Sequence, residues 1–142
     1  MKTFFKSNPF LNLLAGFLLF GILGQGLQAQ EIRVERVQFP PGASTAAIEG
    51  SITGKDPVDY LLNVRKGQYM NVSMASENGG VYFNIMEPDA QYEAIHIGSA
   101  AGNQFEGVMN KSGDYRVRVY LMKGARNSVA NYTLEMIVSG SE

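Results

Sequence analysis

The sequence predicts an all-β protein, an antiparallel β-sandwich of about eight strands. Segments in which apolar and polar residues alternate recur at intervals of roughly 10 to 12 residues, the spacing typical of a sandwich. Turn-forming Gly, Pro, Asn and Asp separate these segments, and only the first 29 residues contain a long apolar run. Because successive strand side chains point to opposite faces, each segment can bury one face. The expected strands are residues 32–39, 46–53, 58–64, 69–74, 81–86, 94–97, 104–109, 115–122 and 132–138.

Residues 1–29 have the order of a secretory signal peptide. Lys2 and Lys6 precede an apolar run, and small or polar residues follow it up to Ala29, where we expect cleavage. The run contains Asn12 and is shorter than the roughly 20 residues that span a bilayer. We therefore expect a removed signal and a mature protein in the periplasm or outside the cell, without a membrane anchor.

The remaining residues, 30–142, are expected to form a single domain. The chain has no cysteine, so an exported protein of this kind must be stabilised by packing and hydrogen bonding alone. Without Lys2 and Lys6 the chain keeps ten Lys and Arg against thirteen Asp and Glu, a net charge of about −3. This balance argues against nucleic acid as a partner. We expect a monomer or weak dimer that needs no cofactor.

Turn residues set the limits of the strands in order. Pro40-Pro41 stops the first segment, because proline cannot donate to a sheet ladder, and predicts an edge strand. Gly54 to Pro57 breaks the second segment, and Lys66-Gly67-Gln68 has the composition of a hairpin turn. Near the C-terminus Tyr115 follows Gly113-Asp114, where its ring can close one end of a sandwich while its hydroxyl bonds to the backbone.

The last two segments, 115–122 and 132–138, predict a hairpin whose apolar faces share one core. The loop expected between them, 123–131, is about twice as long as most hairpin loops. Long loops on rigid scaffolds often carry binding residues. Lys123 and Arg126 in this loop are therefore the first candidates for function.

An active site is not expected, because the residue types that catalysis needs are scarce. His96 is the only histidine and there is no cysteine, so a nucleophilic triad or a zinc site would depend on one residue. Residues 94–98 read as a strand in which His96 takes the polar face, in a structural or solvated role.

Calcium bound by oxygen ligands is a weak alternative. Asp56 and Asp59 lie three residues apart beside a turn, and Glu87, Asp89 and Glu93 share another loop. No EF-hand spacing is present, and such acidic loops are most often simply solvated.

Arg116, Arg118 and Tyr120 occupy one face of the strand that leads to the loop. They can be the solvated outer face of a sheet. Alternatively they form a basic strip that continues to Lys123 and Arg126 and favours an acidic partner surface. The sequence alone leaves both readings open.

The order of several short motifs resembles the bacterial periplasmic inhibitors of goose-type lysozyme. The resemblance covers about residues 34–138, and its Ser-Gly-x-Tyr motif is also similar to the pre-peptidase C-terminal β-sandwich domains. The motifs are Gly54-x-Asp56, Asp59-Tyr60, Lys66-Gly67-Gln68, Ser112-Gly113-x-Tyr115, Arg118-Val119, the basic loop and Tyr132 in a final strand.

The resemblance implies a sandwich that binds the enzyme and plugs its substrate cleft with protruding loops. Arg126 and Asp56 match the inhibitor pattern. Lys123 replaces an arginine and Lys55 replaces a tyrosine, and the basic loop that begins at Lys123 is one residue shorter than in the inhibitors. A guanidinium in the cleft would bind the essential carboxylic acid of the lysozyme. The alternative is a non-catalytic module that binds a glycan, a peptide or calcium. The partner-binding residues implied are Lys55, Asp56, Arg118, Tyr120, Lys123 and Arg126.

Overall fold

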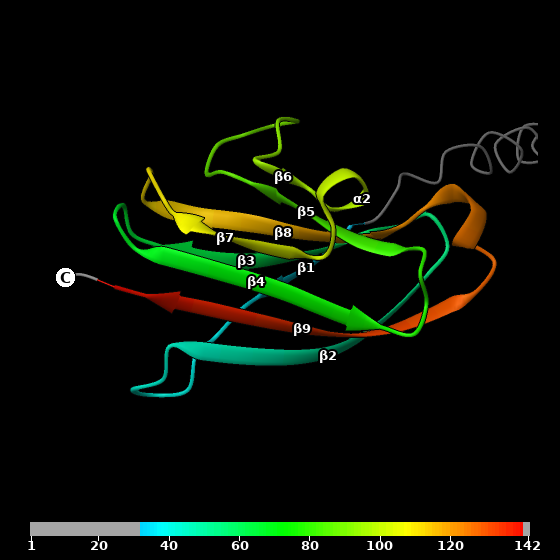
Figure 1. Ribbon diagram of the computed structural model, residues 1–142, viewed down its shortest axis with the longest axis horizontal. Coiled ribbons are helices and arrows are strands. Elements are labelled where there is room, and N and C mark those ends of the chain that lie inside the picture. The colour runs from blue at the N-terminus through cyan, green and yellow to red at the C-terminus, as the bar shows by residue number, and fades with distance from the viewer. Residues whose placement is uncertain (1–31, 141–142) are drawn as a thin grey trace, which may run out of the picture. The chain divides into compact units, whose positions relative to one another are not determined.

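The computed structural model describes residues 32–140, which form two β-sheets packed face to face (Figure 1). The expected signal peptide lies outside these residues. The all-β sandwich is confirmed, with nine strands in the described part of the chain. The five-stranded sheet has the order β1 (Arg33–Arg36), β3 (Val58–Val64), β8 (Gly113–Leu121), β5 (Val81–Met86) and β6 (His96–Ile97). The four-stranded sheet has the order β2 (Thr45–Thr53), β9 (Val129–Ser139), β4 (Tyr69–Ser76) and β7 (Gln104–Val108).

Helical structure in residues 32–140 consists of two short turns, α2 (Gly98–Ala101) and the 3₁₀ turn η2 (Lys123–Ala125). Neither has the length and apolar character that crossing a bilayer would require. The strands therefore supply nearly all of the core.

The strand faces were predicted well. In β8 and β9 the residues at alternate positions are buried, and they pack into one core between the sheets. Full burial of such a side chain stabilises the fold by roughly 1.5 to 3 kcal/mol, which matters in a chain without disulfides. The buried members are Tyr115, Val117, Val119 and Leu121 of β8 and Ala130, Tyr132, Leu134 and Met136 of β9.

The predicted hairpin of the last two segments is wrong. β8 pairs with β3 and β5 in one sheet, whereas β9 pairs with β2 and β4 in the other. The loop between them crosses from one sheet to the other, which accounts for its length without any reference to function. The turn Lys66-Gly67-Gln68 is likewise no hairpin, because β3 and β4 also lie in different sheets.

Strand β1 is an edge strand, as expected, but it runs parallel to β3. The chain passes through the other sheet as β2 before it returns as β3, so both strands enter the sheet in the same direction. The side chain of Arg36 ties β1 down by donating two hydrogen bonds to Asp114 at 3.0 and 2.7 Å. Asn63 donates a third to the same carboxylate at 3.0 Å.

Acid should weaken this attachment. The hydrogen bonds from Arg36 and Asn63 lower the pKa of Asp114 from 3.8 to about 2. Because the pKa is lower in the folded state, the stabilisation is complete above about pH 4 and is lost as the pH falls toward about 2. We expect the melting temperature of Asp114→Asn to fall less steeply than that of the wild type in this window. Equal slopes in thermal melts would contradict the assignment.

Three buried tyrosines close the core. The hydroxyl of Tyr115 donates to the carbonyl of Lys111 at 2.8 Å and accepts from its amide at 3.3 Å, as predicted for a ring that closes one end of the sandwich. Deeper in the core the hydroxyls of Tyr60 and Tyr132 lie 2.6 Å apart, and burial raises the pKa of Tyr132. Gly50 lies opposite Tyr132, where any Cβ would overlap the phenol ring.

Candidate functional site

Three loops meet at one end of the sandwich. The amide of Gly54 donates to the carbonyl of Arg126 at 3.2 Å, and the amide of Met122 donates to the carbonyl of Gly80 at 2.9 Å. The loop that follows β8 is therefore fastened to a neighbour on each side. We call this region the loop end, and it comprises residues 54–57, 77–80 and 122–128.

The crossing loop is locally ordered by its own hydrogen bonds. The amide of Ala125 donates to the carbonyl of Met122 at 2.9 Å and closes the η2 turn. The hydroxyl of Ser128 donates to the carbonyl of Ala125 at 2.7 Å, and the side-chain amide of Asn78 donates to that hydroxyl at 2.9 Å. Side chains on this loop are thus presented from a held backbone.

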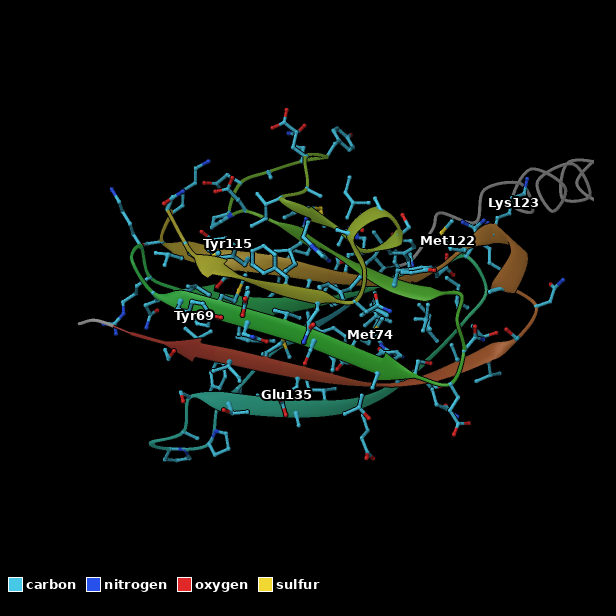
Figure 2. The ribbon with its side chains drawn as sticks, in the orientation of Figure 1. Tyr69, Met74, Tyr115, Met122, Lys123 and Glu135 are labelled. Atoms are coloured by element: carbon cyan, nitrogen blue, oxygen red, sulfur yellow. The ribbon has the colours of Figure 1, made fainter. Side chains whose placement is uncertain are left out.

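Four of the six predicted partner-binding residues lie at the loop end. Lys123 and Arg126 are exposed, and neither side chain has an ion pair or hydrogen bond within residues 32–140. Lys55 and Asp56 are exposed on the adjacent loop. Figure 2 shows Lys123 beside Met122 on the loop that follows β8.

Two exposed apolar side chains flank the basic loop. Met122 is 44% exposed and continues the outward face of β8, while Val129 is 63% exposed and begins the outward face of β9. Since the outward faces of the two sheets point in opposite directions, these side chains lie on opposite sides of the loop. Neither was predicted as a site residue from the sequence, although the alternation in β8 and β9 already assigns both to outward positions.

The predicted basic strip is interrupted, because Arg118 is bound within the protein. Its Nε and Nη2 donate to the two carboxylate oxygens of Asp59 at 2.7 and 2.9 Å. Nε of Arg116 lies 3.1 Å from the same carboxylate, whose side chain is only 3% exposed. The hydrogen bond to Asp59 raises the pKa of Arg118. In the cluster Arg116–Asp59–Arg118 two guanidinium groups therefore share one carboxylate, which leaves one net positive charge.

The two weak calcium candidates have different surroundings. Both carboxylate oxygens of Asp59 are taken by Arg118, whereas Asp56 is exposed on its loop. Among the residues that the structure describes, no three Asp, Glu or His side chains come together as a metal site. Glu87, from the other acidic loop, lies 3.8 Å from the ammonium of Lys111.

Tyr120 lies between the Arg116–Asp59–Arg118 cluster and the loop end. It is half-buried on the outer face of β8, where its ring is 6.3 Å from the ring of Tyr82 on the neighbouring strand β5. Tyr120 is two residues before Met122, so both side chains are on the outward side of β8.

His96 has a structural role and is buried, contrary to the expectation of a polar strand face. It is 6% exposed, stacks on Phe83 at 5.0 Å and meets the edge of Phe105 at 5.5 Å. Its Nε2 lies 2.8 Å from the carbonyl of Gly102, which follows α2. The imidazole therefore fixes a connection between strands.

No family model and no curated protein matches the chain. Among solved structures, PliG of Aeromonas hydrophila, a periplasmic inhibitor of g-type lysozyme, is 32% identical with a TM-score of 0.69. The match covers 78% of this chain and 100% of that one. This chain belongs to the PliG family.

Two further structures share the fold. PliG of Salmonella Typhimurium, also a periplasmic inhibitor of g-type lysozyme, is 23% identical with a TM-score of 0.57 over 75% of this chain and 98% of that chain. The pre-peptidase C-terminal domain of a collagenase from Bacillus anthracis is 23% identical with a TM-score of 0.52 over 80% of this chain and 100% of that domain. Both similarities noted in the sequence are thus confirmed at the level of fold, and membership rests on the Aeromonas PliG.

Proposed function

We propose that this protein is a non-catalytic periplasmic inhibitor of a goose-type lysozyme, which it blocks by inserting the loop end into the substrate cleft. Membership of the PliG family supports the inhibitory role. The observation that carries the mechanism is the pair of exposed cations, Lys123 and Arg126, on a backbone fastened to both neighbouring loops. A held loop loses little conformational entropy on binding, so more of the contact energy becomes affinity.

Arg126 is the residue we assign to the catalytic carboxyl group of the lysozyme. Glycoside hydrolases of this kind depend on a carboxylic acid at the scissile bond. A guanidinium can bind a carboxylate through two parallel charge-assisted hydrogen bonds, which an ammonium cannot. Lys123 would add a point charge beside it. In this chain the anchoring contact therefore falls to Arg126.

The apolar flanks support insertion into a cleft over docking on a flat surface. A flat partner could cover Met122 or Val129, but the two side chains lie on opposite sides of the loop. Only a partner with two facing walls buries both. The rim of the cleft would then contact Lys55, Asp56 and Tyr120. Arg118, which is held by Asp59, would lie next to Tyr120 on the same face of β8.

A lytic assay tests the proposed function. Mature protein, residues 30–142, is added to a goose-type lysozyme acting on bacterial cell walls, with a hen-type lysozyme as the comparison. We expect loss of lysis near equimolar inhibitor for the goose-type enzyme alone, at enzyme concentrations above the dissociation constant. Undiminished lysis at a roughly tenfold molar excess of inhibitor would reject the proposal.

Val129→Ser should weaken inhibition about tenfold, since burial of a valine side chain stabilises a complex by roughly 1.5 kcal/mol. Val108→Ser is a matched control, because Val108 is 61% exposed against 63% for Val129 and lies on β7. The inhibition constants of both variants should be compared at equal folded fraction. Equal losses would show that Val129 does not enter the interface.

A further inference from the structure

A groove lies on the outer face of the five-stranded sheet, away from the loop end. Its floor contains Leu61 of β3 with Asp114 and Arg116 of β8, and residues 87–92 form its wall. Asp114 and Arg116 lie at the start of β8, whereas the loop end follows the last residue of that strand. The groove has a volume of about 750 Å³, within the size range of small-molecule sites.

The wall of the groove is built onto the sheet. Pro88 packs so closely on Gly113 that a Cβ there would lie 2.9 Å from the proline ring. The amide of Ile95 donates to the carbonyl of Ile85 at 2.8 Å and fixes the other end of the wall. Between these anchors Asp89 has φ 64°, a left-handed conformation that costs energy in a residue other than glycine. The groove is thus formed before any ligand binds.

The charges of the groove balance only when its floor and its wall are counted together. Arg116 faces Asp59 at 3.1 Å, and Asp114 accepts the two hydrogen bonds from Arg36. Arg116 shares the Asp59 carboxylate with Arg118, which leaves one positive charge on the floor. The exposed carboxylate of Asp89 in the wall has no ion pair among residues 32–140. With one charge of each sign, the groove as a whole suits a ligand that carries many hydrogen-bonding groups and no net charge.

The residues that line the groove include an aromatic ring and several planar polar groups. Tyr92 is 91% exposed, and it lines the groove together with its neighbour in the sequence, Gln91. Aromatic rings pack on apolar faces, while carboxylate, amide and guanidinium groups each offer two adjacent hydrogen-bonding atoms. A sugar ring has matching parts, namely a C–H face and pairs of neighbouring hydroxyl groups.

We propose that this groove binds a neutral saccharide, with one sugar ring stacked on Tyr92 and its hydroxyl groups bonded by Gln91, Asp114 and Arg116. This activity is additional to lysozyme inhibition and does not depend on it. The protein would then hold a glycan on one surface while the loop end remains available to the enzyme.

The test uses mature protein and the tetramer of N-acetylglucosamine as a neutral probe, with inorganic phosphate as an anionic one. We expect amide chemical shifts around residues 87–92 and 113–116 to change with the tetramer at concentrations up to about 10 mM, and not with phosphate. Tyr92→Ala should weaken binding at least tenfold, whereas Tyr92→Phe, which keeps the ring, should retain it. Both variants should inhibit a goose-type lysozyme as the wild type does.

Each other outcome overturns the saccharide site. These outcomes are no shift with the tetramer, shifts confined to other surfaces, binding of phosphate in its place, or full binding by Tyr92→Ala. The Arg126→Ala variant keeps the groove intact and should still bind the tetramer. A loss of lysozyme inhibition can therefore be distinguished from a loss of saccharide binding.

Discussion

Arg126→Ala is expected to weaken inhibition of a goose-type lysozyme by at least tenfold. Truncating one partner of a charge pair that is desolvated in a complex typically costs on the order of 2 to 5 kcal/mol. In the free protein Arg126 is exposed on the crossing loop and has no side-chain partner among residues 32–140. The melting temperature of the variant should therefore hardly change. Inhibition constants from lytic assays, with thermal melts beside them, measure both effects.

The control for this variant should be another exposed arginine whose side chain forms no ion pair that stabilises the fold. Arg65 is exposed on the turn between β3 and β4, at the end of the sandwich away from the loop end. Arg116 is unsuitable, because it pairs with Asp59. Arg65→Ala should leave inhibition nearly unchanged. Equal losses for both variants would indicate diffuse electrostatic attraction, and full inhibition by Arg126→Ala would assign the contact to a different loop.

Arg118→Met is expected to destabilise the fold by on the order of 2 to 4 kcal/mol, since it leaves the buried carboxylate of Asp59 with one partner in place of two. Asp59 is 2% exposed and receives both of its hydrogen bonds from Arg118. For a domain of this size the melting temperature should fall by about 10 °C. Thermal melting of the purified variant measures the loss.

A second variant separates the buried charge from the lost packing. When Asp59→Leu is combined with Arg118→Met, the uncompensated carboxylate disappears, and much of the stability should return. Arg126→Met is the surface comparison and should stay within about 0.5 kcal/mol of the wild type. A loss at Arg118 no larger than at Arg126 would show that Asp59 is satisfied by Arg116 alone.

Alternation along the sequence predicted which residues face the core, because side-chain direction in a strand follows directly from position. It could not predict which strands pair. The segments 115–122 and 132–138 have the same period whether they form a hairpin or lie in opposite sheets, and their apolar faces share one core either way. Whether they form a hairpin depends on the other strands, because β8 pairs with β3 and β5 while β9 pairs with β2 and β4.

The same limit applies to the candidate site. The loops that contain Lys55 and Arg126 lie 71 positions apart by residue number. They meet because β2 pairs with β9 and β3 pairs with β8, and the bond from Gly54 joins them. Asp59 occupies an outward position that alternation assigns to solvent. It is buried because Arg116 and Arg118 of the neighbouring strand cover it. The alternation within one strand cannot predict contacts with the side chains of another strand.

The position of β8 and β9 in the sheets also bears on how the chain reaches its fold. Each is an interior strand, with β8 between β3 and β5 and β9 between β2 and β4. Before residues 113–139 are available, only the pairs β1–β3, β4–β7 and β5–β6 can form, and β2 has no neighbour. Both sheets must therefore be completed late, by contacts distant in sequence, which is a slow route to the native state.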